Sequence, residues 1–172
     1  MAQHEEQATS KQDDAVRRIG DALESVKDPE IPVISLVELG MIPDVTMTSG
    51  RVTVRMLPTF AGCPALEVMR GDIRRAVEAA GFPDPRVEVV FDPPWTTDRV
   101  TPAGLKKLKK FGLAPPQRHG GMGATENALE QVACPHCDSK NTTLESMFGP
   151  TLCRSIHYCN DCRQSFEQFK PV

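Results

Sequence analysis

Four cysteines near the C-terminus are spaced as ligands of a single metal ion. Cys134 and Cys137 form one Cys-x-x-Cys pair, and Cys159 and Cys162 form a second pair after 21 intervening residues. Each pair places two thiolates in one tight turn, and two such turns complete a tetrahedral four-cysteine zinc site. The segment that carries them, residues 132–172, is too short to fold by burial alone, and bound zinc would supply on the order of 10 kcal/mol. The spacing therefore predicts a zinc ribbon in which the zinc is structural.

The same thiolates leave two other kinds of site open. Four thiolates can also hold an iron–sulfur cluster, whereas a redox dithiol is disfavoured because that motif normally occurs as a single pair. His136 and His157 lie close to the pairs, but four well-spaced cysteines favour a neighbouring or exposed position for both. Cys153 is a leftover thiol. It is either a small buried residue, a fifth thiol near the metal, or a contact of Cys63.

Cys63 is a lone thiol far upstream, in the stretch TFAGCPA. It directly precedes Pro64, at the predicted N-cap of a helix, where unpaired backbone N–H groups and the helix dipole favour a thiolate. The chain has no histidine between His4 and His119, so a Cys-His nucleophilic pair in this region is disfavoured. Metal handling is therefore the better functional interpretation of Cys63. The alternative is a small buried residue that caps the helix.

Three further features could bind or contact something. Asp28 and Glu30 stand in DPEIP, a turn bracketed by prolines, where carboxylates either ligate iron or hold the loop through backbone hydrogen bonds. Trp95 lies among prolines in FDPPWTTD and is either a core residue or an interface anchor. The basic run LKKLKKFG is either a solvated helix face or a contact for an acidic protein partner.

The elements that must position these residues follow from hydrophobic periodicity. The expected elements are a helix over 13–28, a β-hairpin over 43–57 that turns at Ser49-Gly50, a helix from Pro64 to Gly81, a strand over 85–91, and a helix capped by Thr101 and closed by Gly112. This order predicts a compact α+β domain at residues 14–114, after a disordered leader at 1–13. A linker at 115–131 and the zinc ribbon at 132–172 complete the expected organisation.

Composition bounds the class of protein. The 172 residues carry a formal net charge of −3, which argues against a general polyanion binder because nucleic-acid-binding domains usually have a basic excess. The chain has neither an apolar run long enough for a membrane span nor the apolar segment of a secretory signal. We therefore expect a cytoplasmic protein whose cysteines stay reduced and serve as metal ligands or in chemistry, not as disulfides.

A family resemblance rests on several of these stretches together. DPEIPVISLVELGMI and TFAGCPA, in this helix and sheet order, resemble the SufT-like (DUF59) family of iron–sulfur assembly domains. PPWTTDRVTPAGLKKLKKFGLAPP, followed by CPHC, FGPTLCRS and CNDC, narrows the resemblance to the PaaD family, the accessory subunits of bacterial phenylacetyl-CoA epoxidase. The resemblance implies an iron–sulfur-assembly-type fold, a cytoplasmic location and a role in phenylacetate catabolism. It also implies that Cys63 takes part in cluster or metal transfer and that Asp28, Pro29 and Glu30 match the family's DPE motif.

The resemblance implies a maturation factor without a catalytic motif of its own. Such a protein would help to insert an iron–sulfur cluster or iron into the iron–sulfur flavin reductase of the epoxidase, or into its diiron oxygenase as second choice. Cys63 would bind a labile cluster or metal, with Cys153 or a second protomer of a homodimer completing the site. The alternative is a non-catalytic docking subunit of the epoxidase complex that carries only zinc. Binding to membranes is not expected, and binding to nucleic acid is disfavoured.

Overall fold

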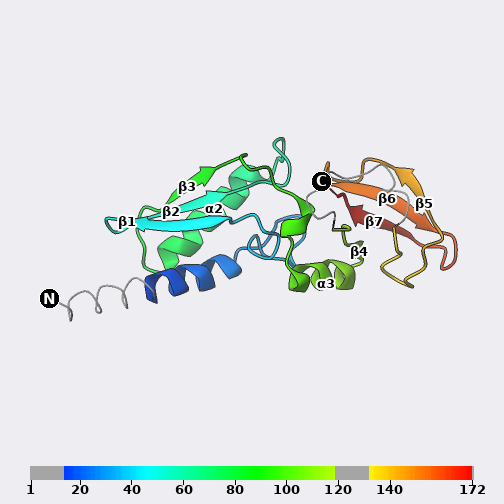
Figure 1. Ribbon diagram of the computed structural model, residues 1–172, viewed down its shortest axis with the longest axis horizontal. Helices are drawn as coiled ribbons and strands as arrows, with labels where there is room; N and C mark the ends of the chain where they lie inside the picture. The colour runs from blue at the N-terminus through cyan, green and yellow to red at the C-terminus, as the bar shows by residue number, and fades with distance from the viewer. Residues whose placement is uncertain (1–13, 119–131, 172) are drawn as a thin grey trace.

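The computed structural model describes residues 14–118 and 132–171. They form two adjoining parts, each built on one sheet, so the molecule is elongated (Figure 1). The predicted leader at 1–13 and most of the predicted linker, residues 119–131, lie outside the described residues. The expected α+β class is confirmed, because helices and sheets are both present in the order that the periodicity predicts.

The first sheet has three strands in the order β1-β2-β3. Strands β1 (Asp44–Thr48) and β2 (Arg51–Met56) form the predicted antiparallel hairpin, and Ser49 and Gly50 both have positive φ at its turn. Strand β3 (Arg86–Val89) pairs parallel to β2. Only one face of this sheet is fully covered, since alternate β2 side chains are buried and those between them are not.

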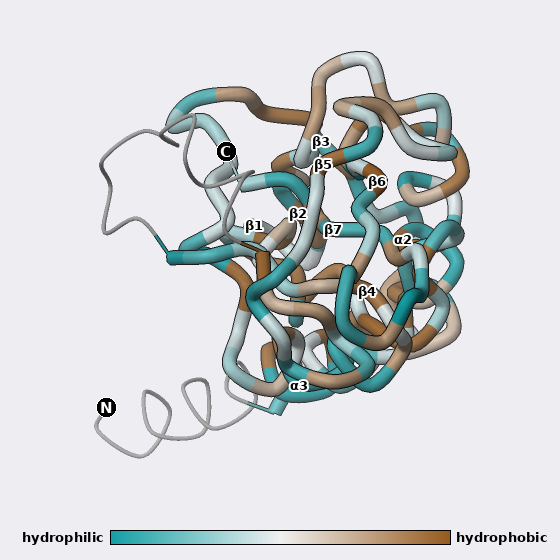
Figure 2. Tube along the Cα trace, turned by 90° about the vertical axis from the view of Figure 1, so that its right-hand side faces the viewer, coloured by the Kyte–Doolittle hydropathy of each residue, from teal (hydrophilic) through white to brown (hydrophobic). Residues whose placement is uncertain are grey.

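Two helices cover that face. The first is described over residues 14–24, and the second is α2 (Leu66–Ala79). Their apolar stripes enter one core with the buried side chains of β2. The members of this core from the three elements are Ile19, Leu23, Met69, Ile73, Val77, Val52, Val54 and Met56. The tube in Figure 2 shows hydrophobic and hydrophilic segments alternating along the chain.

Helix α2 begins two residues later than the sequence predicts. Its N-cap is Ala65, and the preceding residues form turns in which the N–H of Leu66 donates to the carbonyl of Cys63 at 3.2 Å. Proline disfavours helical geometry in the residue before it, so Cys63 is kept out of the helix by Pro64. The predicted end at Gly81 fits better, because this glycine follows the C-cap with a φ of 92°.

Helix α3 (Pro102–Phe111) follows the short 3-10 helix η1 (Thr97–Arg99) and confirms its predicted ends. The hydroxyl of Thr101 accepts a hydrogen bond from the N–H of Gly104 at 3.0 Å, and Gly112 closes the helix with a φ of 90°. Two of its lysines pair with acidic side chains of this chain, Lys107 with Glu38 and Lys109 with Asp138. The basic run therefore ties α3 to its neighbours on both sides.

The second sheet contains the expected ribbon and one strand that the sequence did not predict. Its order is β4-β7-β6-β5, with β5 at Thr142–Ser146, β6 at Arg154–Cys159 and β7 at Ser165–Phe169. Strand β4 (Leu113–Ala114) pairs parallel to β7. It lies in the segment predicted to end the first domain, and a run of two residues has no periodicity to detect. The division into two domains remains a prediction.

The two parts pack against each other. Phe169 of β7 belongs to the core of the first part and meets Trp95 edge to face, with ring centroids 5.8 Å apart. Trp95 is buried and donates from Nε1 to the carbonyl of Leu39 at 2.9 Å, so it is both a core residue and an interface anchor. Arg154 donates to the carbonyl of Glu30 at 2.7 Å across the same interface.

Candidate metal centre and the Cys63 pocket

The four predicted cysteines come together at the end of the second sheet. Cys134, Cys137, Cys159 and Cys162 place their Sγ atoms within 4.8 Å of one another. The Cys134 and Cys162 sulfurs are 3.7 Å apart, and those of Cys137 and Cys159 are 3.6 Å apart. Such spacings suit thiolates around one tetrahedral ion, since each metal–sulfur bond to zinc is about 2.3 Å long. In the described part of the chain, this is the one group of three or more histidine, cysteine, aspartate or glutamate residues whose ligand atoms lie close enough together to hold a metal ion.

Matching backbone turns hold the two cysteine pairs. In the first turn the N–H of Cys134 donates to the carbonyl of Ser139, and the N–H of Asp138 donates to the carbonyl of Cys134. In the second turn the N–H of Cys159 donates to the carbonyl of Gln164, and the N–H of Arg163 donates to the carbonyl of Cys159. Asp138 and Arg163 occupy equivalent places, and both have positive φ, 63° and 60°. The pairs are thus two copies of one turn facing each other.

The thiols of the metal centre differ in pKa, and therefore in how readily each becomes the thiolate that binds a metal. The backbone N–H of Cys162 donates toward the sulfur of Cys159 and lowers the pKa of that thiol to about 7. Burial, together with the neighbouring thiols, raises the pKa of Cys162 to about 12. Metal ligands must be thiolates, so binding here displaces protons. The donor set fits a soft, four-coordinate ion.

Neither histidine near the pairs belongs to this group. His136 is exposed, as predicted. His157 is fully buried in β6, where its ring stacks on Phe166 with centroids 5.4 Å apart and its Nε2 lies 2.9 Å from the Ser155 hydroxyl. Burial lowers the pKa of His157, so it packs as a neutral ring. A polar network stabilises the turns instead, because Asp161 accepts from Ser139 and from Asn141.

Cys63 lies in a second site, a small cavity between the two parts. The loop before α2 and the DPEIP loop form one side, and the β6 end of the ribbon forms the other. The lining includes Cys63, Asp28, Glu30, Cys153 and Phe169. The enclosed volume is about 40 Å³. This is room for a few water molecules.

The prediction of a lowered Cys63 pKa is wrong. Burial raises the pKa of the Cys63 thiol, and the nearby Asp28, Cys153 and Glu30 side chains add to the rise. The N–H of Ala65 donates toward the sulfur and offsets only part of it. Cys63 is not the N-cap of α2, so the helix dipole acts on it less directly than the sequence suggested. The thiol is partly buried and protonated in the metal-free protein.

Asp28 holds the loop beside Cys63. Its Oδ1 accepts from the N–H groups of Glu30 and Ile31, both at 2.8 Å, which is the loop-holding role weighed above. Burial raises the pKa of its carboxyl although these hydrogen bonds lower it. The Glu30 side chain lines the cavity from an exposed residue, and its carbonyl accepts from Arg154. The structure thus brings together both carboxylates of the DPE motif and Cys63.

Cys153 lies in the Cys63 cavity and not among the four ribbon cysteines. Thr151 places its hydroxyl 3.2 Å from the Cys153 sulfur, and the N–H of Lys170 donates to the Cys153 carbonyl at 2.9 Å. Cys153 is thus not a fifth thiol of the metal centre, whereas a small partly buried residue and a neighbour of Cys63 both agree with this position. Nothing in the stretch GPTLCRS alone shows which way it faces.

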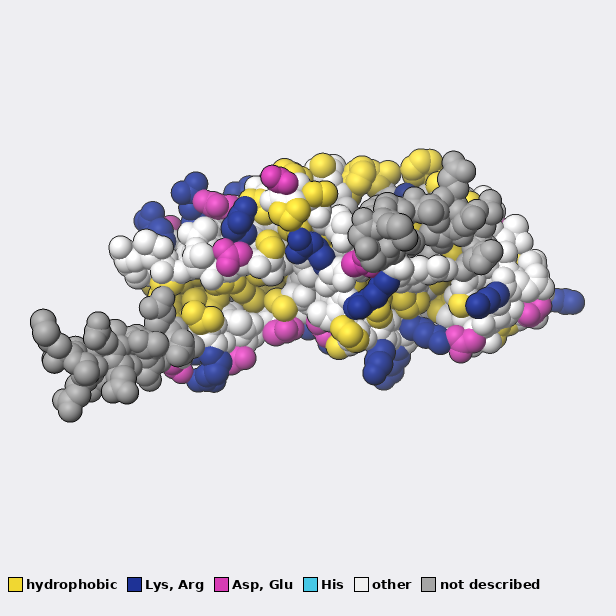
Figure 3. Space-filling view, viewed as in Figure 1, with side chains coloured by type: hydrophobic (Ala, Val, Ile, Leu, Met, Phe, Trp, Pro, Cys, Tyr) yellow, Lys and Arg dark blue, Asp and Glu magenta, His cyan; other side chains and the backbone are white. Residues whose placement is uncertain are grey.

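The surface carries charges of both signs. Figure 3 shows lysine and arginine side chains interspersed with aspartate and glutamate on the face drawn, without one large basic area. Of the helices within residues 14–118 and 132–171, none is both long enough and apolar enough to cross a membrane.

Two family models match the chain. The model described as "Iron-sulfur cluster assembly protein" matches residues 17–90, which include the Cys63 loop and β3. The model described as "PaaD zinc beta ribbon domain" matches residues 119–170, which include all four metal-centre cysteines. The two matches thus fall on the two parts that the structure packs together.

Known proteins also resemble the chain. A subunit of the "Putative 1,2-phenylacetyl-CoA epoxidase" of Escherichia coli (strain K12) is 39% identical over 91% of this chain and 93% of its own length. The "Fe-S protein maturation auxiliary factor YitW" of Bacillus subtilis (strain 168) is 35% identical over 46% of this chain and 79% of its own. A crystal structure of a DUF59 domain from Bacillus anthracis covers 58% of this chain and 96% of its own, with 26% identity and a TM-score of 0.54. The chain therefore belongs to the PaaD family, in which an iron–sulfur cluster assembly domain is joined to a zinc β-ribbon.

Proposed function

We propose that this protein is a maturation factor of a phenylacetyl-CoA epoxidase system, in which Cys63 passes iron or an iron–sulfur cluster to the reductase or the oxygenase component of that system. The names of its relatives support an accessory role in iron–sulfur assembly, since one is an epoxidase subunit and another is a maturation factor. The recipient we favour is the iron–sulfur flavin reductase, and the diiron oxygenase is second. The protein has no catalytic activity of its own in this scheme, and it acts in the cytoplasm.

The observation that carries the proposal is the shared cavity of Cys63, Cys153 and Asp28. Thiolates and a carboxylate are a ligand set that iron accepts. The two thiols come from different parts of the chain, so a ligand bound between them would be released when the parts move apart. The volume of about 40 Å³ suits a single ion. A cluster would require the cavity to open.

The raised pKa of Cys63 suits transient binding. Iron bound at this position displaces the thiol proton, and the Fe–S bond to Cys63 forms as that proton leaves. In delivery, a thiolate of the recipient forms a new bond to iron, the bond to Cys63 breaks, and Cys63 takes up a proton again. Because burial disfavours the free Cys63 thiolate, the protein holds its cargo less tightly than a ligand set of ordinary thiolates would.

The ribbon has a structural part in this scheme. We assign zinc to Cys134, Cys137, Cys159 and Cys162, whose turns fit one tetrahedral ion. Strand β6 begins at Arg154, next to Cys153, and ends at Cys159 in the metal centre. Zinc at one end of this strand therefore keeps Cys153 in place at the other end. The cavity gains its second thiol from the same chain, so the scheme does not need a second protomer.

The second candidate function is a docking subunit that carries only zinc. The small cavity and the raised pKa of Cys63 favour it, because both are also expected of a buried structural cysteine. The two functions predict different complexes. A docking subunit forms a stoichiometric complex with the epoxidase that survives purification, whereas a maturation factor associates substoichiometrically.

Anaerobic purification followed by metal analysis tests the proposal. Zinc, iron and acid-labile sulfide are measured in the wild type, in Cys63→Ser and in Cys153→Ser after reconstitution with ferrous iron and sulfide. We expect one zinc in all three proteins, and iron in the wild type alone. Iron of equal amount in Cys63→Ser would remove Cys63 from the scheme, and no reconstitutable iron in any of them would favour the docking subunit.

A further inference from the structure

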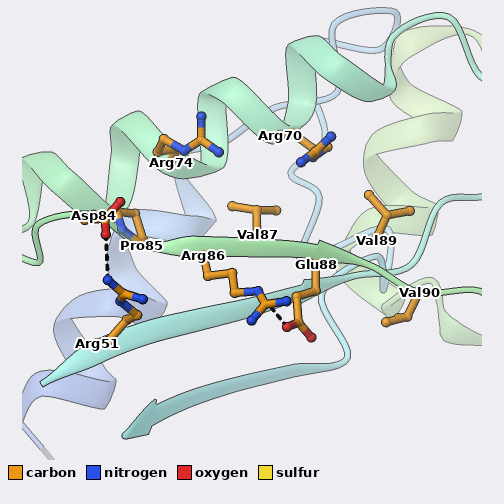
Figure 4. Close-up of a pocket in the computed structure, with 10 residues that line it drawn as sticks. All are labelled: Arg51, Arg70, Arg74, Asp84, Pro85, Arg86, Val87, Glu88, Val89 and Val90. Atoms are coloured by element: carbon orange, nitrogen blue, oxygen red, sulfur yellow. Dashed lines mark hydrogen bonds and ion pairs between the residues drawn. The ribbon is translucent and has the colours of Figure 1, made fainter. Parts of the chain in front are cut away.

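A groove runs along the outer edge of the first sheet, away from both thiol sites. Strand β3 is the last strand of that sheet, and residues 84–90 line the groove together with side chains of α2 and of Arg51. The groove has a volume of about 660 Å³. Figure 4 looks onto it, with α2 above β3 and the hairpin below. The metal transfer proposed above does not use the residues of this groove.

The backbone of β3 has hydrogen-bonding groups to offer along this edge. The N–H of Val90 donates to the carbonyl of Met56, so Val90 turns its backbone toward β2. The N–H and C=O of one strand residue point to the same side, and the side alternates along the strand. Val87 and Val89 therefore direct their N–H and C=O away from β2. Within residues 14–118 and 132–171 no strand pairs with this edge, and an edge of this kind is a template for one more strand.

Arginines flank this edge on both sides. Arg70 and Arg74 overhang it from α2, and Arg51 and Arg86 lie on the other side of β3 (Figure 4). Four arginines stand against two carboxylates in the lining, although the whole chain has a net charge of −3. Positive charge is therefore concentrated here in an otherwise acidic protein.

The two sides differ in how far their charge is already neutralised. Below β3, Arg51 pairs with Asp84 and Arg86 pairs with Glu88, both at 2.9 Å. Above it, Arg70 pairs with Glu67 outside the groove, and its Nε is buried without a hydrogen-bond partner among the described residues. Arg74 is exposed, and the described residues give it no ion pair. On the side facing α2, the positive charge is therefore not neutralised by a carboxylate of the groove.

We propose that the edge of β3 binds an extended acidic segment of a partner protein as an additional strand. The segment is about as long as β3 and bonds through its backbone to Val87 and Val89. Every second side chain of the segment faces α2. These side chains are acidic, because there they can form ion pairs with Arg70 and Arg74. Side chains pointing the other way meet arginines that are already paired, so acidity is not required of them. This mode of recognition joins backbone affinity to side-chain specificity.

Charge also decides between this occupant and two others. A second copy of the chain that paired through β3 would bring Arg70 and Arg74 of both copies together, and like charges facing each other across strands are destabilising. A nucleic acid would be held by its phosphates alone and would make no use of the free N–H and C=O groups of Val87 and Val89. An acidic strand uses both features of the groove.

A pair of peptides of equal composition tests the proposal on the full chain. The fluorescein-labelled probe Thr-Glu-Val-Glu-Val-Thr places both glutamates on one face of a strand, and its isomer Thr-Glu-Glu-Val-Val-Thr places them on opposite faces. Binding is measured by fluorescence anisotropy, and amide signals of the labelled protein report the site. We expect the probe to bind at least about tenfold more tightly than the isomer, with the largest shifts at Val87 and Val89.

Three variants separate strand addition from general charge attraction. Arg74→Glu is expected to weaken the probe about tenfold or more, whereas Lys106→Glu, with the same change in charge on α3, leaves it unchanged. Val89→Pro removes an outward N–H that β2 does not use, so we expect a folded protein that no longer binds. Amide signals of the core check the folding of each variant.

Four outcomes would overturn the proposal. They are no binding of the probe, equal binding of probe and isomer, equal weakening by Lys106→Glu, and undiminished binding to a folded Val89→Pro. A β3-dependent dimer in sedimentation would assign the edge to a second copy instead. Oligonucleotide binding that Val89→Pro leaves intact would assign the groove to phosphates. The proposal does not depend on metal transfer, because Cys63→Ser is expected to bind the probe as the wild type does.

Discussion

The four-cysteine centre and the Cys63 cavity are both thiol sites, but the chain builds them in different ways. In the first, two identical turns face each other and the four Sγ atoms already lie within 4.8 Å. In the second, Cys63 and Cys153 come from separate parts, share a cavity and are both free thiols. A preformed set of four thiolates is suited to keeping its ion. Two thiols held by the packing of two parts are suited to binding and releasing one.

The largest expected effect is loss of the metal centre. Replacing Cys159 by serine removes one of four ligands, and the loss of zinc withdraws on the order of 10 kcal/mol from the ribbon. We expect the second sheet to unfold, which circular dichroism and backbone amide signals would show. Cys153→Ser is the matched control and should keep both zinc and the fold. A folded, zinc-loaded Cys159→Ser protein would contradict the assignment of the metal centre.

Packing between the two parts is expected to have the next largest effect. Trp95→Ala deletes the ring that meets Phe169 and should lower the free energy of unfolding by about 3–5 kcal/mol. Trp95→Phe keeps a ring but loses the hydrogen bond to the Leu39 carbonyl, and it should lower the free energy of unfolding by about 1 kcal/mol. Urea denaturation gives both values. Equal effects from the two variants would mean that the ring contact does not hold the parts together.

The metal centre should also respond to pH through its thiols. The pKa of Cys159 is about 7 and that of Cys162 about 12 in the metal-free protein, so protons compete with the metal more strongly as the pH falls. Each displaced proton changes the apparent affinity by up to about tenfold per pH unit. Competition with a chelator, one unit below and one unit above pH 7, should show tighter binding at the higher pH. A pH-independent affinity would exclude protonated thiols in the metal-free site.

Asp28 should show the smallest effect. Asp28→Ala removes the acceptor of two backbone N–H groups and should cost about 1–2 kcal/mol, whereas Asp28→Asn keeps an oxygen there. Burial raises the Asp28 pKa, so the folded state binds its proton more tightly than the unfolded state does. That contribution to stability is present below the unfolded pKa and is lost as the pH rises through the folded pKa. Asp28→Asn should therefore flatten the pH dependence of unfolding in the acidic range, and an unchanged profile would contradict this.

The same comparison shows what the sequence could predict. The hairpin, helix α3 and the cysteine turns are set by residues close together in the chain, such as Ser49-Gly50 and Thr101, and each was predicted. The facing of Cys153 and Cys63, the pairing of β4 with β7 and the contact of Trp95 with Phe169 depend on how distant segments pack. No local pattern encodes such contacts. The prediction of a lowered Cys63 pKa was wrong for the same reason. Burial between the two parts raises this pKa, and its effect is larger than that of the nearby helix.

The metal content of the reductase in cells tests directly whether Cys63 delivers iron or a cluster to the epoxidase system, as we propose. The iron–sulfur flavin reductase is purified from cells that lack this protein, and from the same cells supplied with the wild type, Cys63→Ser or Cys153→Ser. Its iron and acid-labile sulfide are then counted per polypeptide. Without this protein we expect a cluster-deficient reductase, whose cluster the wild type restores and Cys63→Ser does not. A reductase and a diiron oxygenase that are both fully loaded without this protein would contradict it.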